Sequence, residues 1–376
     1  MNIPVAKPYF DKKEEEAVIK ALRSGWVTQG PRVAEFEEIF AKFSGTKYAV
    51  ATSSATTALF LSLYALGIGK GDEVLVPSLS FIASANVIMH VGAKPVFIDI
   101  DPATYNIDVA KIEAKITKRT KAILPVDQLG LPFDKKGVKK IAKKYSLLVV
   151  EDAACAIGSS YKGKNLGGAF DVACFSFHPR KVVTTGDGGM ITTNSKKIAD
   201  MAKMLRQQGM GTSDLKRHES NKVAHEKYPV VGFNFRLTDI QAAVGIEQFK
   251  KLPMFLAKRR EIAERYNKAF SKIDLIVPPF VPKGCQPNWQ SYIIRLKRNI
   301  KIGRDELMQK LLDKGISTRR GLMAIHEEKP YRKMYPNLHL PQTEAATRET
   351  ICLPIYHTLK IAEQNRIIKE IAAQLK

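Results

Sequence analysis

Seven short apolar segments alternate with segments of helical character in the first half of the chain, and this alternation restricts the possible folds more than any other feature. The apolar segments are residues 47–53, 72–78, 94–101, 121–127, 146–153, 172–178 and 188–194. Several of them are nearly continuous apolar runs, which are typical of strands buried on both faces of a sheet. Strands that alternate with helices predict an α/β domain with a mostly parallel, seven-stranded sheet.

The character of the sequence changes near residue 250. Prolines cluster between Leu252 and Pro287, and one strand candidate and two helical segments follow them. We therefore expect a large domain at residues 1–250 and a smaller α+β domain at residues 251–376. The helices expected along the chain include residues 11–25, 31–45, a long helix from Thr238, 304–315 and 361–376, and the strand candidate of the second domain is residues 291–296.

The formal net charge of +23 is unusual in a chain that is otherwise ordinary, with 45% apolar and 26% charged residues. In residues 134–146, Val138 and Ile141 recur at helical spacing, and six lysines between Lys135 and Lys144 occupy the remaining faces. This pattern predicts an amphipathic helix with a solvated back. No nucleic-acid-binding motif accompanies the charge, so we expect mostly an ordinary solvated surface, of which a small part steers an anionic substrate, and no nucleic-acid partner.

Other simple classes of protein are also excluded. No apolar run reaches the length of a membrane span, and the N-terminus lacks a signal pattern, so no stable membrane insertion is expected. The four cysteines are widely scattered without a C-x-x-C pair, which argues against a disulfide framework and against structural zinc. These observations predict a cytoplasmic protein that holds no metal.

Small hydroxyl residues open a helix directly after the first apolar segment. The stretch TSSATTALFLSL, residues 52–63, places Ser54 and Thr56 at this junction. Free backbone N–H groups at a helix start, together with hydroxyl groups, can hold a phosphate. Ordinary N-capping of the helix explains the same residues equally well.

Asp152 ends the strongly apolar segment 146–153. A buried carboxylate requires a cationic or hydrogen-bonding partner, because its desolvation is costly. The protonated nitrogen of a pyridine ring would be such a partner. The alternative is a carboxylate that caps the next helix.

Ser176 and Lys181 follow the segment 172–178 together, in the stretch SFHPRKVVTTGDGG. A phosphate on Ser176 and an aldehyde joined to the amine of Lys181 could belong to one molecule. Phe81, in a loop of small residues after another strand candidate, could stack on a flat ring. The alternatives are a solvated lysine and a core phenylalanine. With Asp152, the set describes a site for pyridoxal 5′-phosphate (PLP).

These residues also resemble a known family, the nucleotide-sugar aminotransferases of the DegT–StrS group among the fold type I PLP-dependent enzymes. The resemblance extends from Pro8 to about Leu353. It implies a large domain with a seven-stranded mixed sheet and a small C-terminal domain. It is carried, in the family's order, by SGWVTQGP, SSATTALFLSL, SFIASANVIMHVGAKPVFIDID, VVEDAACAIGSSYKG, CFSFHPRKVVTTGDGGMITT, GFNFRLTDIQAAVGIEQ and GISTRR.

The resemblance implies a role for each site residue. Lys181 forms the Schiff base with PLP, Asp152 pairs with the pyridine nitrogen, and Phe81 stacks on the ring. The backbone at Ala55 and Thr56 takes the phosphate. Two further cofactor contacts are implied. Ser176 contacts the same phosphate, and Asn234 contacts the phosphate of the cofactor in the neighbouring subunit of a homodimer.

The sequence departs from the family pattern at several places. Ala55 replaces a glycine of the phosphate loop, which leaves the backbone N–H groups in place. Cys155 stands where glutamine or histidine often lies next to the phenolic oxygen of the cofactor, and a thiol is a weaker hydrogen-bond partner. Asp127 stands where histidine is common. One branch of the family has histidine at the position of Lys181 and dehydrates a keto-sugar, so lysine favours amino transfer.

The resemblance further implies transfer of an amino group from glutamate, through the pyridoxamine form of the cofactor (PMP), to a nucleotide-linked keto-hexose. Such amino sugars serve surface polysaccharides or glycans. The segment RRGLMAIH, residues 319–326, departs from the family and should face the sugar. The candidate substrate contacts are Thr28, Arg319, Arg320 and His326.

Two alternatives stay open. The acceptor could be a keto-cyclitol or an antibiotic sugar, because relatives share the PLP residues. The chain could also be a PLP-fold protein that serves as a regulator or binding protein, although the presence of both Lys181 and Asp152 argues for retained chemistry.

Overall fold

The computed structural model describes residues 2–211, 225–298 and 300–375. All seven predicted strands lie in one sheet of order β1-β9-β8-β5-β4-β2-β3. Only β9 runs against its neighbours, β1 and β8, and the other pairs are parallel. The predicted α/β fold is thereby confirmed. The strands are Tyr48–Thr52 (β1), Glu73–Pro77 (β2), Lys94–Ile98 (β3), Thr120–Ile123 (β4), Leu148–Asp152 (β5), Val172–Ser176 (β8) and Gly189–Thr193 (β9).

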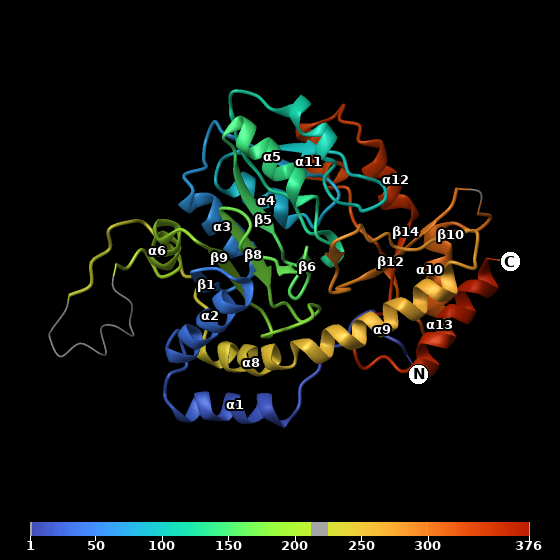
Figure 1. The fold of residues 1–376 in the computed structure, drawn as a ribbon, viewed down its shortest axis with the longest axis horizontal. Coiled ribbons are helices and arrows are strands. Elements are labelled where there is room, and N and C mark those ends of the chain that lie inside the picture. Colours follow the sequence, from blue (N-terminus) through green and yellow to red (C-terminus); the bar gives the residue numbers. More distant parts are fainter. Residues whose placement is uncertain (1, 212–224, 299, 376) are drawn as a thin grey trace.

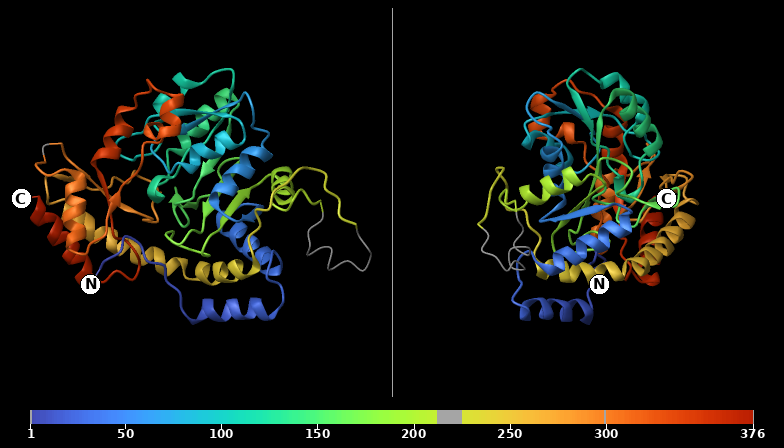
Figure 2. Two further views of the ribbon diagram at one scale, coloured as in Figure 1. Left: turned by 180° about the vertical axis from the view of Figure 1, so that it is seen from behind. Right: turned by 60° about the vertical axis from the view of Figure 1, so that its left-hand side comes forward.

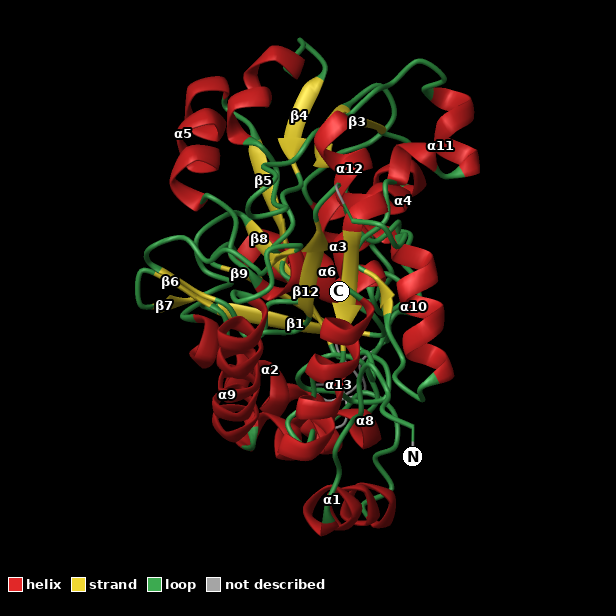
Figure 3. Ribbon diagram, turned by 90° about the vertical axis from the view of Figure 1, so that its right-hand side faces the viewer, coloured by secondary structure: helices red, strands yellow, loops and turns green. Residues whose placement is uncertain are grey.

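Helices cover both faces of this sheet (Figure 1). Alternate strand residues pack against α3, α4 and α6 on one face and against α2, α5 and α8 on the other, as the period of two requires. Figure 3 shows α4 and α5 on opposite sides of β4 and β5. The helices are Lys12–Arg23 (α1), Pro31–Ser44 (α2), Ala55–Ala65 (α3), Ala83–His90 (α4), Lys135–Tyr145 (α5), Lys196–Leu205 (α6), Asp239–Lys250 (α8) and Leu252–Phe270 (α9).

The long helix expected from Thr238 is in fact two helices. Thr238 caps α8, which ends at Lys250, and α9 begins at Leu252 with Pro253 in its first turn. Proline suits the first turn of a helix but cannot continue the hydrogen bonds of a preceding one. The two helices nevertheless lie almost end to end along one side of the molecule (Figure 2).

The C-terminal region forms a second core around a four-stranded antiparallel sheet of order β10-β12-β14-β13. This core begins within α9 at Ile262 and also includes Ile3 from the N-terminus. The division near residue 250 stays a prediction. The elements are Ile276–Val277 (β10), Tyr292–Leu296 (β12), Arg319–Arg320 (β13), Thr350–Leu353 (β14), Arg304–Asp313 (α10), Lys329–Met334 (α11), Pro341–Glu349 (α12) and Ile361–Gln374 (α13), and a separate small sheet holds Ser160–Tyr161 (β6), Lys164–Asn165 (β7) and Cys285–Gln286 (β11).

None of the helices in the described residues is both long enough and apolar enough to cross a membrane.

The expectation that all six lysines of α5 are solvated is wrong for Lys135. This first residue of the helix is buried, and its Nζ lies 3.2 Å from Asp127 Oδ1 and 2.7 Å from Glu151 Oε1. The ammonium also lies 3.9 Å from the centre of the Phe133 ring. Both carboxylates are fully buried, and burial raises the pKa of Asp127 well above its usual value. The burial of Lys135 therefore follows from the need of two buried acids for a cation.

Replacing Lys135 with methionine should destabilise the protein by roughly 3–5 kcal/mol, because two buried carboxylates would lose their cation. Lys139→Met, on the exposed face of the same helix, should change the free energy of unfolding by less than ~0.5 kcal/mol. Urea unfolding at pH 7 measures both. The loss at Lys135 should shrink at acidic pH, where the carboxyl groups take up protons. Equal stability of the Lys135 variant and the wild type would contradict this account.

Candidate active site

The strand ends that carry the predicted site residues meet at one edge of the large sheet. Asp152 ends β5 and Ser176 ends β8, and these strands are parallel neighbours. The turns after β1 and β2 lead into α3 and α4, which begin near Ser54 and Phe81. Ligands of open α/β sheets bind at this edge, because the strands present loops and helix starts there.

Lys181 lies in the connection between β8 and β9. This connection is short because β9 returns antiparallel to β8, with Ser176 paired to Gly189. Lys181 N–H donates to the carbonyl of His178, and Arg180 N–H donates to His178 Nδ1. His178 thus shapes the loop. Burial and the Lys181 charge lower the pKa of His178, which keeps its ring neutral.

The amine of Lys181 points at a thiol. Lys181 Nζ lies 3.0 Å from Cys155 Sγ. Cys155 follows β5 in the loop that begins at Asp152, so the two residues predicted from separate motifs share one small volume. Neither side chain is fully buried, which leaves the amine open to a carbonyl compound.

Asp152 is buried and has two hydrogen-bond donors. Ser84 Oγ donates to Oδ2 at 2.8 Å, and Ala154 N–H donates to Oδ1 at 3.1 Å. Burial raises the pKa of Asp152 despite these bonds and the charge of Lys181. A cation placed beside this carboxylate would offset its desolvation, and a protonated pyridine nitrogen is such a cation.

The start of α3 has two roles. The Ser54 hydroxyl accepts from Thr57 N–H and the Thr57 hydroxyl bonds back to Ser54, so Ser54 forms an ordinary capping box, as the alternative held. The amides of Ala55 and Thr56 lie in the first turn, beyond the reach of any helical carbonyl. These amides, rather than the Ser54 hydroxyl, are available to a phosphate.

Gly189 joins this helix start to Ser176. It pairs with Thr52 on β1 and with Ser176 on β8. A Cβ at Gly189 would lie 2.3 Å from Ser54 O and 2.7 Å from Ala55 N, so only glycine permits the approach. The Ser176 hydroxyl at the end of β8 and the free amides of α3, which follows β1, are thereby held on either side of β9.

Phe81 is 61% exposed at the entrance to α4, which excludes the alternative of a core phenylalanine. Its carbonyl accepts from Ser84 N–H, and Ser84 in turn bonds to Asp152. The backbone of Phe81 and the carboxylate of Asp152 are therefore linked through the same turn.

The remaining candidates lie apart from this cluster or behind it. Thr28 is on the exposed loop between α1 and α2, and Asn234 is exposed in a bridge to Gln207. Arg319 and Arg320 are exposed on β13, and the charge of Arg319 acts on His178. His326 is 3% exposed, with Nδ1 2.7 Å from Ser78 Oγ and Nε2 facing Glu344, so it presents no free nitrogen to a ligand.

Three contributors escaped the sequence analysis, which are Ser84, Asn288 and Gln290. Ser84 is the second residue of α4 and lies three positions after Phe81, so its spacing from Phe81 was a usable signal. Asn288 and Gln290 reach the site from a loop more than a hundred residues beyond Lys181, and no local pattern marks them. Asn288 donates to the carbonyl of Cys155, and Gln290 bonds to both peptide groups that flank Lys181.

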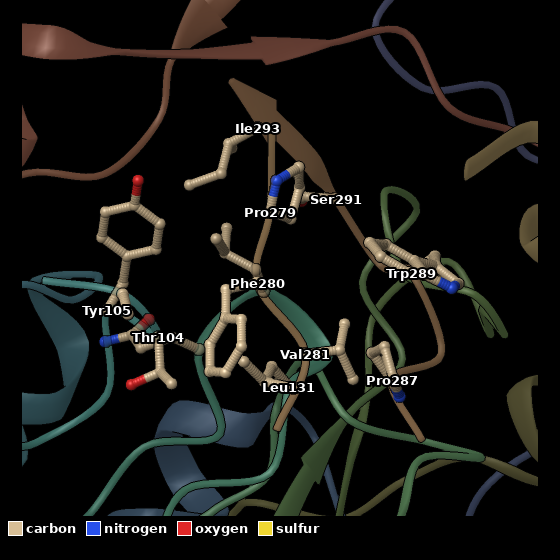
Figure 4. A pocket seen from close by; sticks show the side chains of 13 residues that line it. Thr104, Tyr105, Leu131, Pro279, Phe280, Val281, Pro287, Trp289, Ser291 and Ile293 are labelled. Atoms are coloured by element: carbon tan, nitrogen blue, oxygen red, sulfur yellow. The ribbon is translucent and has the colours of Figure 1, made fainter. Parts of the chain in front are cut away.

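A cavity near this loop is apolar and separate from the cluster (Figure 4). Its volume of about 30 Å³ is too small for a cofactor ring. Tyr105, Leu129 and Trp289 line it, and all three have left-handed backbones with φ near 60°. The tight loops around it therefore serve to position chain segments rather than to hold a ligand.

Comparison with known proteins defines the class to which this site belongs. Residues 8–372 match the model of the DegT/DnrJ/EryC1/StrS aminotransferase family. The uncharacterized protein MJ1066 of Methanocaldococcus jannaschii is 40% identical over 358 residues, which cover 94% of this chain and 92% of that protein. The chain belongs to the DegT/DnrJ/EryC1/StrS aminotransferase family.

Solved structures agree with this assignment. PseC of Helicobacter pylori, an aminotransferase involved in the biosynthesis of pseudoaminic acid, has a TM-score of 0.93 at 30% identity, with 100% of this chain and 99% of that chain covered. The aminotransferase TlmJ of Streptoalloteichus hindustanus has a TM-score of 0.92 at 34% identity, with 100% and 99% covered. The protein is therefore a PLP-dependent aminotransferase of fold type I, as the resemblance implied.

Replacing Asp152 with asparagine should slow the reaction of PLP-loaded enzyme with an amino donor by ~100-fold or more, because a preorganised charge that stabilises the reacting ring would be lost. Stopped-flow absorbance of the bound PLP measures this rate. Asp187→Asn, an exposed carboxylate in the Lys181 loop, is the matched control and should retain the wild-type rate. A wild-type rate in Asp152→Asn would contradict the assigned role.

Proposed function

We propose that the protein transfers an amino group from glutamate to a nucleotide-linked keto-hexose. The observation that carries this proposal is the accessible amine of Lys181, held beside Cys155 at the same sheet edge as the buried Asp152. Two structural neighbours support a sugar as acceptor. One is PseC, and the other is described as a putative sugar aminotransferase, Spr1654 of Streptococcus pneumoniae.

The residues of this chain divide the work of holding PLP and moving protons. PLP, when bound, supplies an aldehyde that reacts with amines and a ring that withdraws electrons. Lys181 would hold the aldehyde in the resting enzyme, and its amine, once displaced by the amino donor, would be free to move a proton at the substrate carbon. Asp152 keeps a positive charge on the ring nitrogen, and Phe81 covers the ring. The amides of Ala55 and Thr56, with the hydroxyl of Ser176, fix the phosphate.

The substrate side is formed by the exposed pair Arg319 and Arg320 on β13. A guanidinium group suits the phosphates of a nucleotide, because it can donate paired hydrogen bonds. His326 supports this surface indirectly, since its ring joins Ser78 to Glu344. The protein acts as a cytoplasmic homodimer in which Asn234 reaches the phosphate of the neighbouring subunit's cofactor, and Thr28 is a further substrate contact. The net charge of +23 attracts the anionic substrate.

A second acceptor class is a keto-sugar of antibiotic biosynthesis or a keto-cyclitol. The chain is also similar to DesV of S. venezuelae, solved with a ketimine intermediate, at a TM-score of 0.89 and 32% identity over 99% of each chain. The two classes share the residues around Lys181 and differ in what Arg319 and Arg320 must bind.

Purified protein with PLP and glutamate should release 2-oxoglutarate beyond the single equivalent of the first half-reaction only when a nucleotide-linked keto-hexose is also supplied. A panel of nucleotide-linked 3-keto and 4-keto sugars, analysed by mass spectrometry for the amino product, identifies the acceptor. Lys181→Ala should show no turnover, whereas Lys164→Ala, an exposed lysine on β7, should match the wild type. Turnover with a keto-cyclitol and with no nucleotide sugar would overturn the proposal.

Arg319→Gln and Arg320→Gln should each raise KM for the nucleotide sugar by roughly 10- to 100-fold, the loss expected for one charge-assisted hydrogen bond. The rate of the half-reaction with glutamate should stay unchanged, because no nucleotide takes part in it. Steady-state and single-turnover kinetics separate the two effects. Arg332→Gln, an exposed arginine on α11, is the matched control. An unchanged KM in both variants would exclude β13 from the substrate site.

A further inference from the structure

The segment Asn288–Gln290 passes between the two loops that carry the reactive pair. Asn288 is 2% exposed, and its Nδ2 donates to the carbonyls of Cys155 and Ile157, each at 2.8 Å. Its Oδ1 accepts from Gln290 N–H at 2.8 Å. Asn288 thus fixes the loop of Cys155 and, at the same time, the backbone of Gln290.

Gln290 brackets Lys181. Its Oε1 accepts from Val182 N–H at 3.0 Å, and its Nε2 donates to the carbonyl of Arg180 at 2.6 Å. The side chain is buried, so both bonds form away from water and neither is readily replaced. One amide therefore holds the peptide groups on both sides of the residue that reacts with the cofactor.

Arg259 on α9 anchors this segment from the other side. Its Nη1 donates to the carbonyls of Trp289 at 2.9 Å and Gln290 at 3.3 Å. The guanidinium is 3% exposed, and burial lowers the pKa of Arg259 to about 10. Burying a cation costs free energy. Because the buried guanidinium donates to two carbonyls of this segment, we infer that it fixes the backbone there.

The packing around Gly130 leaves no space for a side chain beside Asn288. A Cβ at Gly130 would lie 1.9 Å from Asn288 Oδ1 and 3.0 Å from the Cys155 carbonyl. Trp289, between the two amides, has φ of 54°, a left-handed conformation that is uncommon for a bulky residue. The segment is thus held in an unfavourable backbone conformation by the bonds of its neighbours.

We propose that Gln290 is a positioning residue for Lys181 and that Asn288 and Arg259 hold Gln290 in place for this role. The inference rests on the PLP chemistry of the proposed function, but not on the identity of the acceptor. Gln290 sets the backbone of Lys181, Asn288 sets that of Cys155, and the two together set the 3.0 Å separation between Nζ and Sγ. A displacement of about 1 Å at a reacting atom can slow a reaction on the order of 100-fold.

The test compares binding of PMP with covalent attachment of PLP in the apo-enzyme. PMP has no aldehyde, so its affinity reports the phosphate and ring contacts alone. Attachment of PLP to Lys181 is measured by borohydride trapping over time and by the mass of the Lys181 peptide. Gln290→Met should slow attachment by at least ~tenfold and leave the Kd of PMP unchanged, because it removes both bonds to the Lys181 loop and touches no cofactor contact.

Gln364→Met is the matched control. Gln364 is also buried and donates to the carbonyl of Ile262 in the second core, remote from Lys181 in the fold. This variant should attach PLP at the wild-type rate even where its stability falls. If Gln290→Met does not fold, Gln290→Glu is the second variant. It retains the acceptor for Val182 N–H and loses the donor to the Arg180 carbonyl. It should also attach PLP more slowly and bind PMP with an unchanged Kd.

Two results would overturn the inference. Attachment at the wild-type rate in a folded Gln290 variant would show that Lys181 needs no such support. A parallel loss of PMP binding would show that Gln290 only maintains the site as a whole. Neither measurement uses a sugar, so failure to find a nucleotide-sugar acceptor would refute the proposed function and leave this inference standing.

Discussion

The carboxyl end of β5 carries two adjacent buried acids, and much of the surrounding structure serves to accommodate them. Glu151 and Asp152 are successive strand residues, so their side chains leave opposite faces of the sheet. On one face Glu151 and Asp127 share the ammonium of Lys135. On the other, Asp152 accepts hydrogen bonds from Ser84 and Ala154, and burial raises its pKa despite these bonds and the more distant charge of Lys181. The first charge is compensated within the fold, whereas the second is left for the cofactor.

This asymmetry explains why the site is built from helix starts and strand ends rather than from a separate insertion. The start of α5 places Lys135 on one face of β5, and the start of α4 places Ser84 and Phe81 on the other. The start of α3 is drawn against β9 by Gly189, whose lack of a side chain permits the contact. Each helix start thus performs both a structural and a chemical task.

The sequence predicted those parts of the molecule that depend on local pattern. Apolar runs and the residues that end them predicted all seven strands and the helices α1, α2 and α5. They also predicted that Asp152 and Lys181 lie at strand ends.

Two side chains were misjudged because their neighbours come from distant parts of the sequence. Lys135 looks like its five solvated neighbours until Asp127 and Glu151 are brought beneath it. His326 looks available until Ser78 and Glu344 enclose it. Gln290 could not be found at all, since its two partners flank a lysine 109 positions away in the chain.

The position of Gln290 also has a consequence for how the two cores communicate. The segment that holds the Lys181 loop continues directly into β12, one of the two central strands of the second sheet. Arg259 holds this segment to α9, which contributes to both cores. Phe255 on α9 packs in the first core and Ile262, two turns later, in the second. Any rotation of the second core about α9 must therefore move the amide that brackets Lys181. Because hydrogen bonds of 2.6–3.0 Å tolerate little displacement, the geometry of the reactive amine is tied to the seating of the C-terminal region on the large sheet.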